Sequence, residues 1–184
     1  LERIGNIGYN VSYEILNASD YGVPQNRRRV FFIGLLKGEF EFPDKFDYKV
    51  SSSEAIMDLI QSNENEIQKY SAPSRNEYQK LMRNGKKTFK NHEVTIHNEQ
   101  TINVISLVPD GGNIKSLPEE YWNIRKYNKA FQRMNSKLPS NTIDTGHRNY
   151  FHYEANRIPT ARESARIQSF PDSFEFLGKK GSQY

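Results

Sequence analysis

The chain has 184 residues, of which 35% are hydrophobic and 12% aromatic, with a formal net charge of +4. The absence of cysteine excludes disulfide bonds, cysteine-ligated zinc and a cysteine nucleophile within this chain. No apolar run reaches the roughly 18 residues of a membrane-spanning helix, and the mild basic excess is compatible with a polyanionic partner.

The first 38 residues predict a helix end, a strand, a loop and a second strand. Residues 10–16 (NVSYEIL) alternate between apolar and polar, which predicts a half-buried strand. Residues 30–36 (VFFIGLL) form a continuous apolar run, which predicts a strand covered on both faces, as in a layered sheet. Because two strands cannot bury both faces by themselves, we expect the chain, which begins with Leu1, to be a piece of a longer protein with further strands.

The middle of the chain predicts short helices separated by polar segments. Ser51 lies three residues before Glu54, the spacing of a capping box, and an apolar helical stripe follows. A second helix is expected over residues 78–85, ended by Gly85. Residues 101–117 form a short apolar segment that contains a Pro-Asp-Gly-Gly turn at 109–112.

Three consecutive arginines precede the second strand. A guanidinium group presents a planar fork of donors that binds phosphate or a base edge with two hydrogen bonds. Strand alternation predicts that Arg27 and Arg29 share one side and that Arg28 lies on the other. The alternative is a solvated positive rim with carboxylate partners nearby.

A basic and aromatic stretch occupies residues 121–137. Its aromatic rings could stack on nucleobases while its cations hold phosphates. The alternative is that the rings fill a core and the cations face water. The four histidines, His92, His97, His147 and His152, are too dispersed to predict a metal site.

Residues 157–172 predict a helix in which Thr160 is the N-cap and Glu163 completes a capping box. The simplest interpretation is a surface helix, with Arg162 and Arg166 facing solvent and Glu163 occupied by the cap. That interpretation leaves the Phe-Pro-Asp ending at 170–172 without an explanation.

Taken in order, these stretches resemble the C-terminal part of a DNA (cytosine-5-)methyltransferase of the bacterial restriction-modification type. DYGVPQNRRRVFFIG (20–34) is similar to motif VIII of that family, Gln-x-Arg-x-Arg before a strand. LPSNTI (138–143) is similar to the segment before motif IX, and GSQY (181–184) to the lead-in to motif X. RIPTARESARIQSFPD (157–172) is similar to motif IX, matching at Arg157, Thr160, Arg162, Glu163, Ala165, Arg166, Gln168, Phe170, Pro171 and Asp172.

The resemblance implies an α/β fold in three parts. Residues 1–38 would be the last strands of a Rossmann-like sheet that binds S-adenosylmethionine in the intact enzyme. Residues 39–155 would be a mixed α+β target-recognition domain. Residues 156–184 would hold the motif IX helix and the lead-in to motif X.

The resemblance also implies roles for individual residues. Gln25, Arg27 and Arg29 would be catalytic-site residues, with Arg29 at the carbonyl oxygen of a cytosine rotated out of the duplex and Arg27 at phosphate and neighbouring groups. Arg28 would face elsewhere on the DNA. Further candidates for DNA binding are Arg125, Lys126, Asn128, Gln132, Asn141 and Arg148. The structural residues of motif IX would be Arg157, Thr160, Arg162, Glu163, Arg166 and Gln168.

The intact parent would methylate C5 of a flipped cytosine in a specific duplex sequence, with S-adenosylmethionine as methyl donor, in the bacterial cytoplasm at the nucleoid. In this family the Pro-Cys nucleophile, the Glu-Asn-Val motif and the Gly-rich cofactor loop precede motif VIII, and this chain contains none of them. We therefore expect the chain alone to be inactive and to bind neither cofactor nor metal. The alternatives are a non-catalytic DNA-binding module derived from a degenerate methylase and a basic scaffold without a nucleic-acid partner. The resemblance implies nothing about the oligomeric state.

Overall fold

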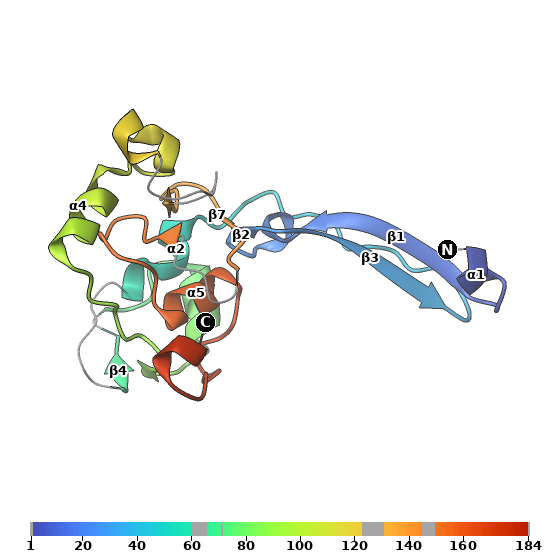
Figure 1. Cartoon of the computed structure of the whole chain (residues 1–184). Coiled ribbons are helices and arrows are strands. Elements are labelled where there is room, and N and C mark those ends of the chain that lie inside the picture. Colours follow the sequence, from blue (N-terminus) through green and yellow to red (C-terminus); the bar gives the residue numbers. More distant parts are fainter. Residues whose placement is uncertain (1, 60–65, 71, 123–130, 145–149, 184) are drawn as a thin grey trace.

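A computed structural model describes residues 2–59, 66–70, 72–122, 131–144 and 150–183. A long, two-stranded hairpin projects from a rounded body that contains most of the helices (Figure 1). The described N-terminal residues lie at the far end of the hairpin, and the C-terminal residues lie in the body (Figure 1).

The hairpin consists of strands β1 (Asn10–Asn17) and β3 (Arg28–Leu35), which pair antiparallel from Asn10 opposite Leu35 to Asn17 opposite Arg28. The short helix α1 (Glu2–Gly5) precedes β1. A 3-10 helix, η1 (Ala18–Tyr21), and the short strand β2 (Gln25–Asn26) connect β1 to β3 at the end nearest the body. The predicted helix, strand, loop and strand are therefore confirmed.

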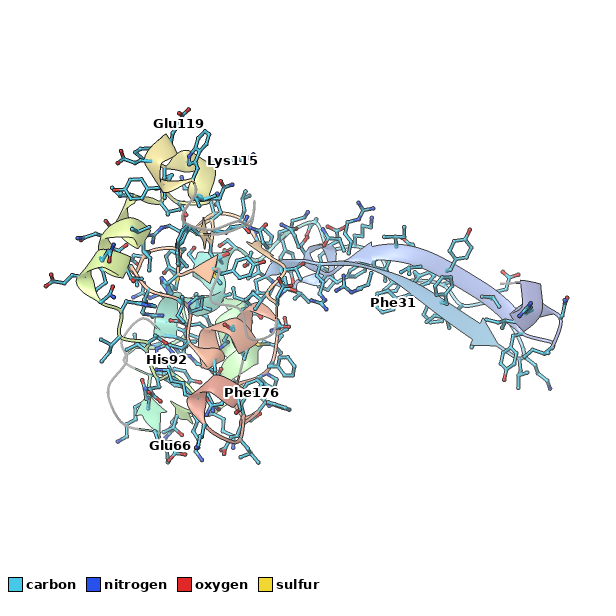
Figure 2. The ribbon with its side chains drawn as sticks, viewed as in Figure 1. Phe31, Glu66, His92, Lys115, Glu119 and Phe176 are labelled. Atoms are coloured by element: carbon cyan, nitrogen blue, oxygen red, sulfur yellow. The ribbon has the colours of Figure 1, made fainter. Side chains whose placement is uncertain are left out.

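The apolar side chains of these strands are exposed, so the described residues do not provide the predicted cover. Tyr13 is 60% exposed and Phe32 56%, and Ile15, Val30 and Phe31 are exposed as well. Among the described residues, β1 and β3 pair only with each other, and a two-stranded ribbon by itself cannot bury its side chains. Figure 2 shows Phe31 on the hairpin, away from the body.

The body is a mixed α/β arrangement with very small sheets. Strands β4 (Gln68–Lys69) and β5 (Thr88–Phe89) pair antiparallel, and β6 (Gln132–Arg133) and β8 (Tyr150–Phe151) pair parallel. Strand β7 (Ser140–Asn141) pairs parallel with β2 of the hairpin connection. The helical elements of the body are α2 (Ser52–Ile56), η2 (Met57–Leu59), α3 (Glu77–Arg83), α4 (Glu99–Leu107), η3 (Ile114–Ser116), η4 (Glu119–Tyr121), α5 (Ala161–Ile167) and η5 (Lys180–Ser182).

Local sequence signals account for the helix ends. The capping boxes predicted at Ser51 and at Thr160 are both formed, at the N-termini of α2 and α5. Helix α3 ends where the backbone turns left-handed at Asn84 and Gly85. The apolar segment expected over 101–117 begins within α4, and the turn that follows the helix is closed by a 2.9 Å hydrogen bond from Gly112 N to the carbonyl of Pro109.

Two apolar clusters form the core of the body. The first joins α2, α3 and α5 and contains Val50, Ala55, Ile56, Leu59, Tyr78, Met82, Phe89, Met134 and Ile167. The second lies under α4 and contains Ile105, Val108, Ile114, Leu117, Phe151 and Ile158. No helix in the described ranges is long and apolar enough to cross a membrane.

Candidate nucleic-acid interface

The junction between the hairpin and the body brings two distant sequence stretches together. In the β2–β7 pair, Gln25 lies opposite Ser140 and Asn26 opposite Asn141. Ser140 N donates a 2.9 Å hydrogen bond to the carbonyl of Pro24. The QNRRR stretch therefore meets the LPSNTI stretch at the point where the hairpin enters the body (Figure 1). We call this junction the β2–β7 seam.

Gln25 places a buried amide at the seam. The residue is 1% exposed, and its Nε2 has no hydrogen-bond partner among the described residues. A buried amide donor without a partner costs free energy, and a group that enters the site and accepts its hydrogen bond recovers that cost. The neighbouring Asn26 is exposed, since alternate side chains of a strand point to opposite sides.

The arginine cluster lies directly beyond the seam. Arg28 and Arg29 are exposed at the start of β3, and Arg27 is half-buried between β2 and β3. Arg29 Nη1 donates a 2.7 Å hydrogen bond to the carbonyl of Arg28. Within the described residues none of the three forms an ion pair, so the carboxylate partners of the alternative interpretation are not found there. The guanidinium donors of this cluster suit phosphate or base oxygens.

The arginines of α5 do not belong to this surface. Arg162 and Arg166 are both 0% exposed, so the interpretation in which they face solvent is wrong. Arg162 Nε donates to the carbonyl of Lys90 at 2.9 Å, and Nη1 donates to the carbonyl of Pro171 at 3.1 Å. A guanidinium has five donors, and here they satisfy carbonyl groups of neighbouring chain segments.

Arg166 lies at the centre of a buried charge network. Its Nε and Nη2 each lie 2.6 Å from an oxygen of Asp172, and its Nη1 lies 3.1 Å from Asp58. Asp58 in turn accepts hydrogen bonds from Arg83 Nε and Nη2 at 2.9 and 2.7 Å. Burial alone would lower the pKa of Arg166, but the hydrogen bonds to Asp172 raise it overall. The network ties α5 to η2 and α3.

Glu163 anchors a second buried network at the N-terminus of α5. Its two oxygens accept hydrogen bonds from Arg157 Nη1 and Nη2, each at 2.7 Å. Burial alone would raise the pKa of Glu163, but Arg157 lowers it to about 2. His152 Nε2 lies 3.6 Å from Glu163, and burial lowers the pKa of His152 to about 4. The network thus holds one ion pair beside a neutral imidazole at neutral pH.

The other predicted residues are more scattered. Asn141 is exposed at the seam, Gln132 is half-buried in β6, and Gln168 is exposed just after α5. Arg125, Lys126, Asn128 and Arg148 lie outside the described residues. No group of three or more metal-ligating side chains was found in the described ranges.

Arg133 and Asp58 were missed by sequence reasoning. Arg133 belongs to the basic and aromatic stretch, yet it is buried, and it donates to the carbonyls of Val108 at 2.7 Å and Ile105 at 2.6 Å. It thereby binds carbonyl groups at the C-terminal end of α4. No local signal separates this arginine from its neighbours, because its acceptors lie at least 19 residues away, both earlier (Val108, Ile105) and later (His152, Asn156) in the chain.

A pocket of about 320 Å³ lies in the body and is lined in part by Glu66, Lys90, His92 and Phe176. Figure 2 shows Glu66, His92 and Phe176 in the body, away from the projecting hairpin. Lys90 Nζ is 2.9 Å from Glu175, another residue of the lining, so this charge is already paired. In the described ranges no glycine-rich loop joins a strand to a helix N-terminus, the arrangement that holds a nucleotide-like cofactor.

Residues 1–184 match the family described as C-5 cytosine-specific DNA methylase. The chain is similar to the type II methyltransferase M.DdeI of Desulfomicrobium norvegicum, with 37% identity over 202 residues that cover 97% of this chain and 48% of that protein. It is also similar to the type II methyltransferase M1.HphI of Haemophilus parahaemolyticus, with 35% identity over 183 residues that cover 99% of this chain and 44% of that protein. The chain therefore spans about half the length of these curated relatives.

The fold is similar to a crystal structure described as a DNA modification methyltransferase encoded within an E. coli prophage. The TM-score is 0.75 at 21% identity, and the match covers 97% of this chain and 55% of the other. At this level of identity the likeness shows the fold alone.

Proposed function

Because the chain belongs to the C-5 cytosine-specific DNA methylase family, we propose that it is the C-terminal part of a type II DNA (cytosine-5-)methyltransferase and contains its target-recognition domain. The order of the two motif-like stretches supports this proposal, as does the coverage of about half of each relative. The partner is duplex DNA, and the reaction of the parent is methylation of C5 of a cytosine rotated out of the duplex.

The β2–β7 seam carries this proposal. It brings the arginine cluster, for which no ion pair is found among the described residues, close to Asn141 in the C-terminal part of the long segment between the two motifs. In our proposal Arg29 and Arg27 hold the flipped base and its phosphates, and residues 39–155 read the surrounding sequence. The buried amide of Gln25, whose Nε2 lacks a hydrogen-bond partner in the described part of the chain, supports a role in binding a group of the substrate nucleotide.

The exposed hairpin supports the proposed position of the chain within the parent. The apolar side chains of β1 and β3 would be covered if residues 1–38 were the last strands of a larger, Rossmann-like sheet, with residues 156–184 carrying motif IX. The parent's other strands would then contribute the cysteine nucleophile and the cofactor site. S-adenosylmethionine bound there would supply the methyl group.

Within this scheme the chain contributes electrostatics and positioning. A guanidinium fixed near the carbonyl oxygen of cytosine stabilises the negative charge that develops when a nucleophile adds to the ring. This contribution is electrostatic stabilisation rather than proton transfer. The chain by itself would bind DNA without methylating it.

Methylation-sensitive sequencing of DNA from cells that express the intact parent tests the proposal. We expect C5-methylcytosine within one short recognition sequence, and none in cells that carry an empty vector. Binding of the parent to DNA without any methylation would favour the alternative, a non-catalytic module derived from a methylase.

A further inference from the structure

The connection between β1 and β3, residues 18–27, is held at its neck by its own backbone. Ala18 N donates to the carbonyl of Arg27 at 3.1 Å, and Val23 N donates to the carbonyl of Ala18 at 3.2 Å. Gly22 ends η1 in the left-handed conformation, with φ of 79°. This connection, here called the arginine turn, carries Gln25 and leads directly into Arg28 and Arg29.

The linker from β3 to α2, residues 36–51, packs on one side of the arginine turn. Phe46 N donates a 2.9 Å hydrogen bond to the carbonyl of Asp20. The carboxylate of Asp20 lies 3.1 Å from Lys49 Nζ and 3.7 Å from Lys45 Nζ. The hydrogen bond from Lys49, with the charges of both lysines, lowers the pKa of Asp20. Three residues of the linker therefore bind one residue of the turn.

The ring of Phe46 covers Gly22. A methyl group placed on Gly22 would lie 3.2 Å from Cε2 of Phe46, closer than such contacts normally are. The ring of Tyr48 stacks on that of Phe46, with the ring centroids 5.3 Å apart and 14° between the ring planes, and its hydroxyl oxygen lies 3.9 Å from the same methyl position. Glycine is therefore required at position 22 for two reasons, the positive φ and the close approach of the Phe46 ring.

The β2–β7 seam holds the other side of the arginine turn, and the two contacts are joined through α2. Ser52 N donates to the carbonyl of Leu138 at 2.9 Å, two residues before β7. Ser53 Oγ donates to the carbonyl of Ser136 at 2.6 Å. The segment that follows Phe46 therefore binds the segment that precedes β7. The turn, the linker, α2 and β7 therefore form a closed cycle of contacts.

We infer that Phe46, together with Asp20, is a positioning residue that fixes the arginine turn relative to the recognition domain. This inference rests on the proposed function and adds Phe46, a residue outside both motif-like stretches. Phe46 would act through Gly22 and the turn, and it would touch no substrate. Catalysis requires the guanidinium group to be placed within a fraction of an ångström of its position at the flipped base. A looser turn should therefore lower the methylation rate more than it lowers the affinity for DNA.

The test compares Phe46→Ala with Phe46→Tyr in the intact parent, since tyrosine keeps the ring that covers Gly22. We expect Phe46→Ala to lower the single-turnover methylation rate about tenfold or more, because a misplaced group loses its catalytic effect. The dissociation constant for cognate DNA should change less than about threefold, and Phe46→Tyr should behave like the wild type. An unchanged rate in Phe46→Ala, or an equal loss of rate and affinity, would overturn the inference.

Hydrogen exchange separates this inference from the proposed function. We expect amide exchange of residues 18–27 in the free parent to be faster in Phe46→Ala than in wild type and Phe46→Tyr. If the wild-type parent does not methylate DNA, the proposed function fails, and the exchange of this turn still decides whether Phe46 holds it. Equal exchange in all three proteins would overturn the positioning role even in an active enzyme.

Discussion

Arg166 binds both carboxylate oxygens of Asp172, six residues later in the chain, through Nε and Nη2 at 2.6 Å each. Both residues are buried, and Asp58 and Arg83 extend the network to the first core cluster. Asp172 ends the motif IX stretch, and the simple helix interpretation left this ending unexplained. Its role is to provide a buried partner for an arginine of the helix itself.

Removal of one member of this pair should strongly destabilise the body. We expect Asp172→Asn to lower the free energy of unfolding by about 3–5 kcal/mol, since it leaves the charge of Arg166 without its main partner. Denaturant unfolding monitored by circular dichroism measures the change. The control is Lys80→Ala, which breaks an exposed ion pair with Glu77 and should change stability by less than about 1 kcal/mol. Equal effects of the two substitutions would contradict this account.

Acid should destabilise the body through His152. Its pKa is lowered by burial from 6.5 to about 4 in the folded chain, so the unfolded chain binds more protons between these values. The contribution of His152 is therefore complete above pH 6.5 and is lost as the pH falls toward 4, by an amount on the order of 3 kcal/mol. His92, whose pKa is also lowered by burial, adds to the same trend.

Unfolding experiments at pH 5 and pH 7 measure this dependence. In His152→Gln the difference in stability between the two pH values should be smaller than in the wild type, with the remainder due to His92 and the carboxylates. The carboxylate of Glu163, which forms an ion pair with Arg157, stays charged between pH 5 and pH 7, because the pKa of Glu163 is about 2. An identical pH dependence in both proteins would show that His152 does not titrate as described.

Arg29→Ala in the intact parent should impair catalysis more than binding. We expect turnover to fall about 100-fold, because a preorganised charge at the reacting ring is lost. The affinity for non-specific DNA should fall by no more than the loss of one phosphate contact would cause. Arg28→Ala, a change at the adjacent exposed arginine, is the matched control and should reduce turnover far less. Equal losses of turnover and affinity in Arg29→Ala would make this residue a phosphate contact only.

Exchange of the segment between the motifs should change the DNA sequence that is methylated. We expect a parent in which residues 39–140 are replaced by the corresponding segment of a relative to methylate the relative's site, since base-edge contacts carry sequence specificity. Methylation-sensitive sequencing compares the exchanged and original proteins. If the original site is retained, recognition belongs to another part of the parent.

Short-range features of this protein follow from its sequence alone. The capping boxes at Ser51 and Thr160, the end of α3 at Gly85 and the positions of β1 and β3 depend on residues a few positions apart. The order of the two motif-like stretches indicated the family, because such matches depend on residue identity and spacing only.

Tertiary structure decided which charges are buried and which strands meet. Arg166 and Asp58 are separated by 108 residues, and a buried arginine is tolerated only where the fold supplies such partners to offset its loss of hydration. The pairing of Gln25 with Ser140 also joins distant segments, as does the contact of Phe46 with Gly22. On the hairpin, an apolar pattern predicted cover that no layer among the described residues provides. Burial depends on what the rest of the fold brings to a side chain, and a local pattern does not contain that information.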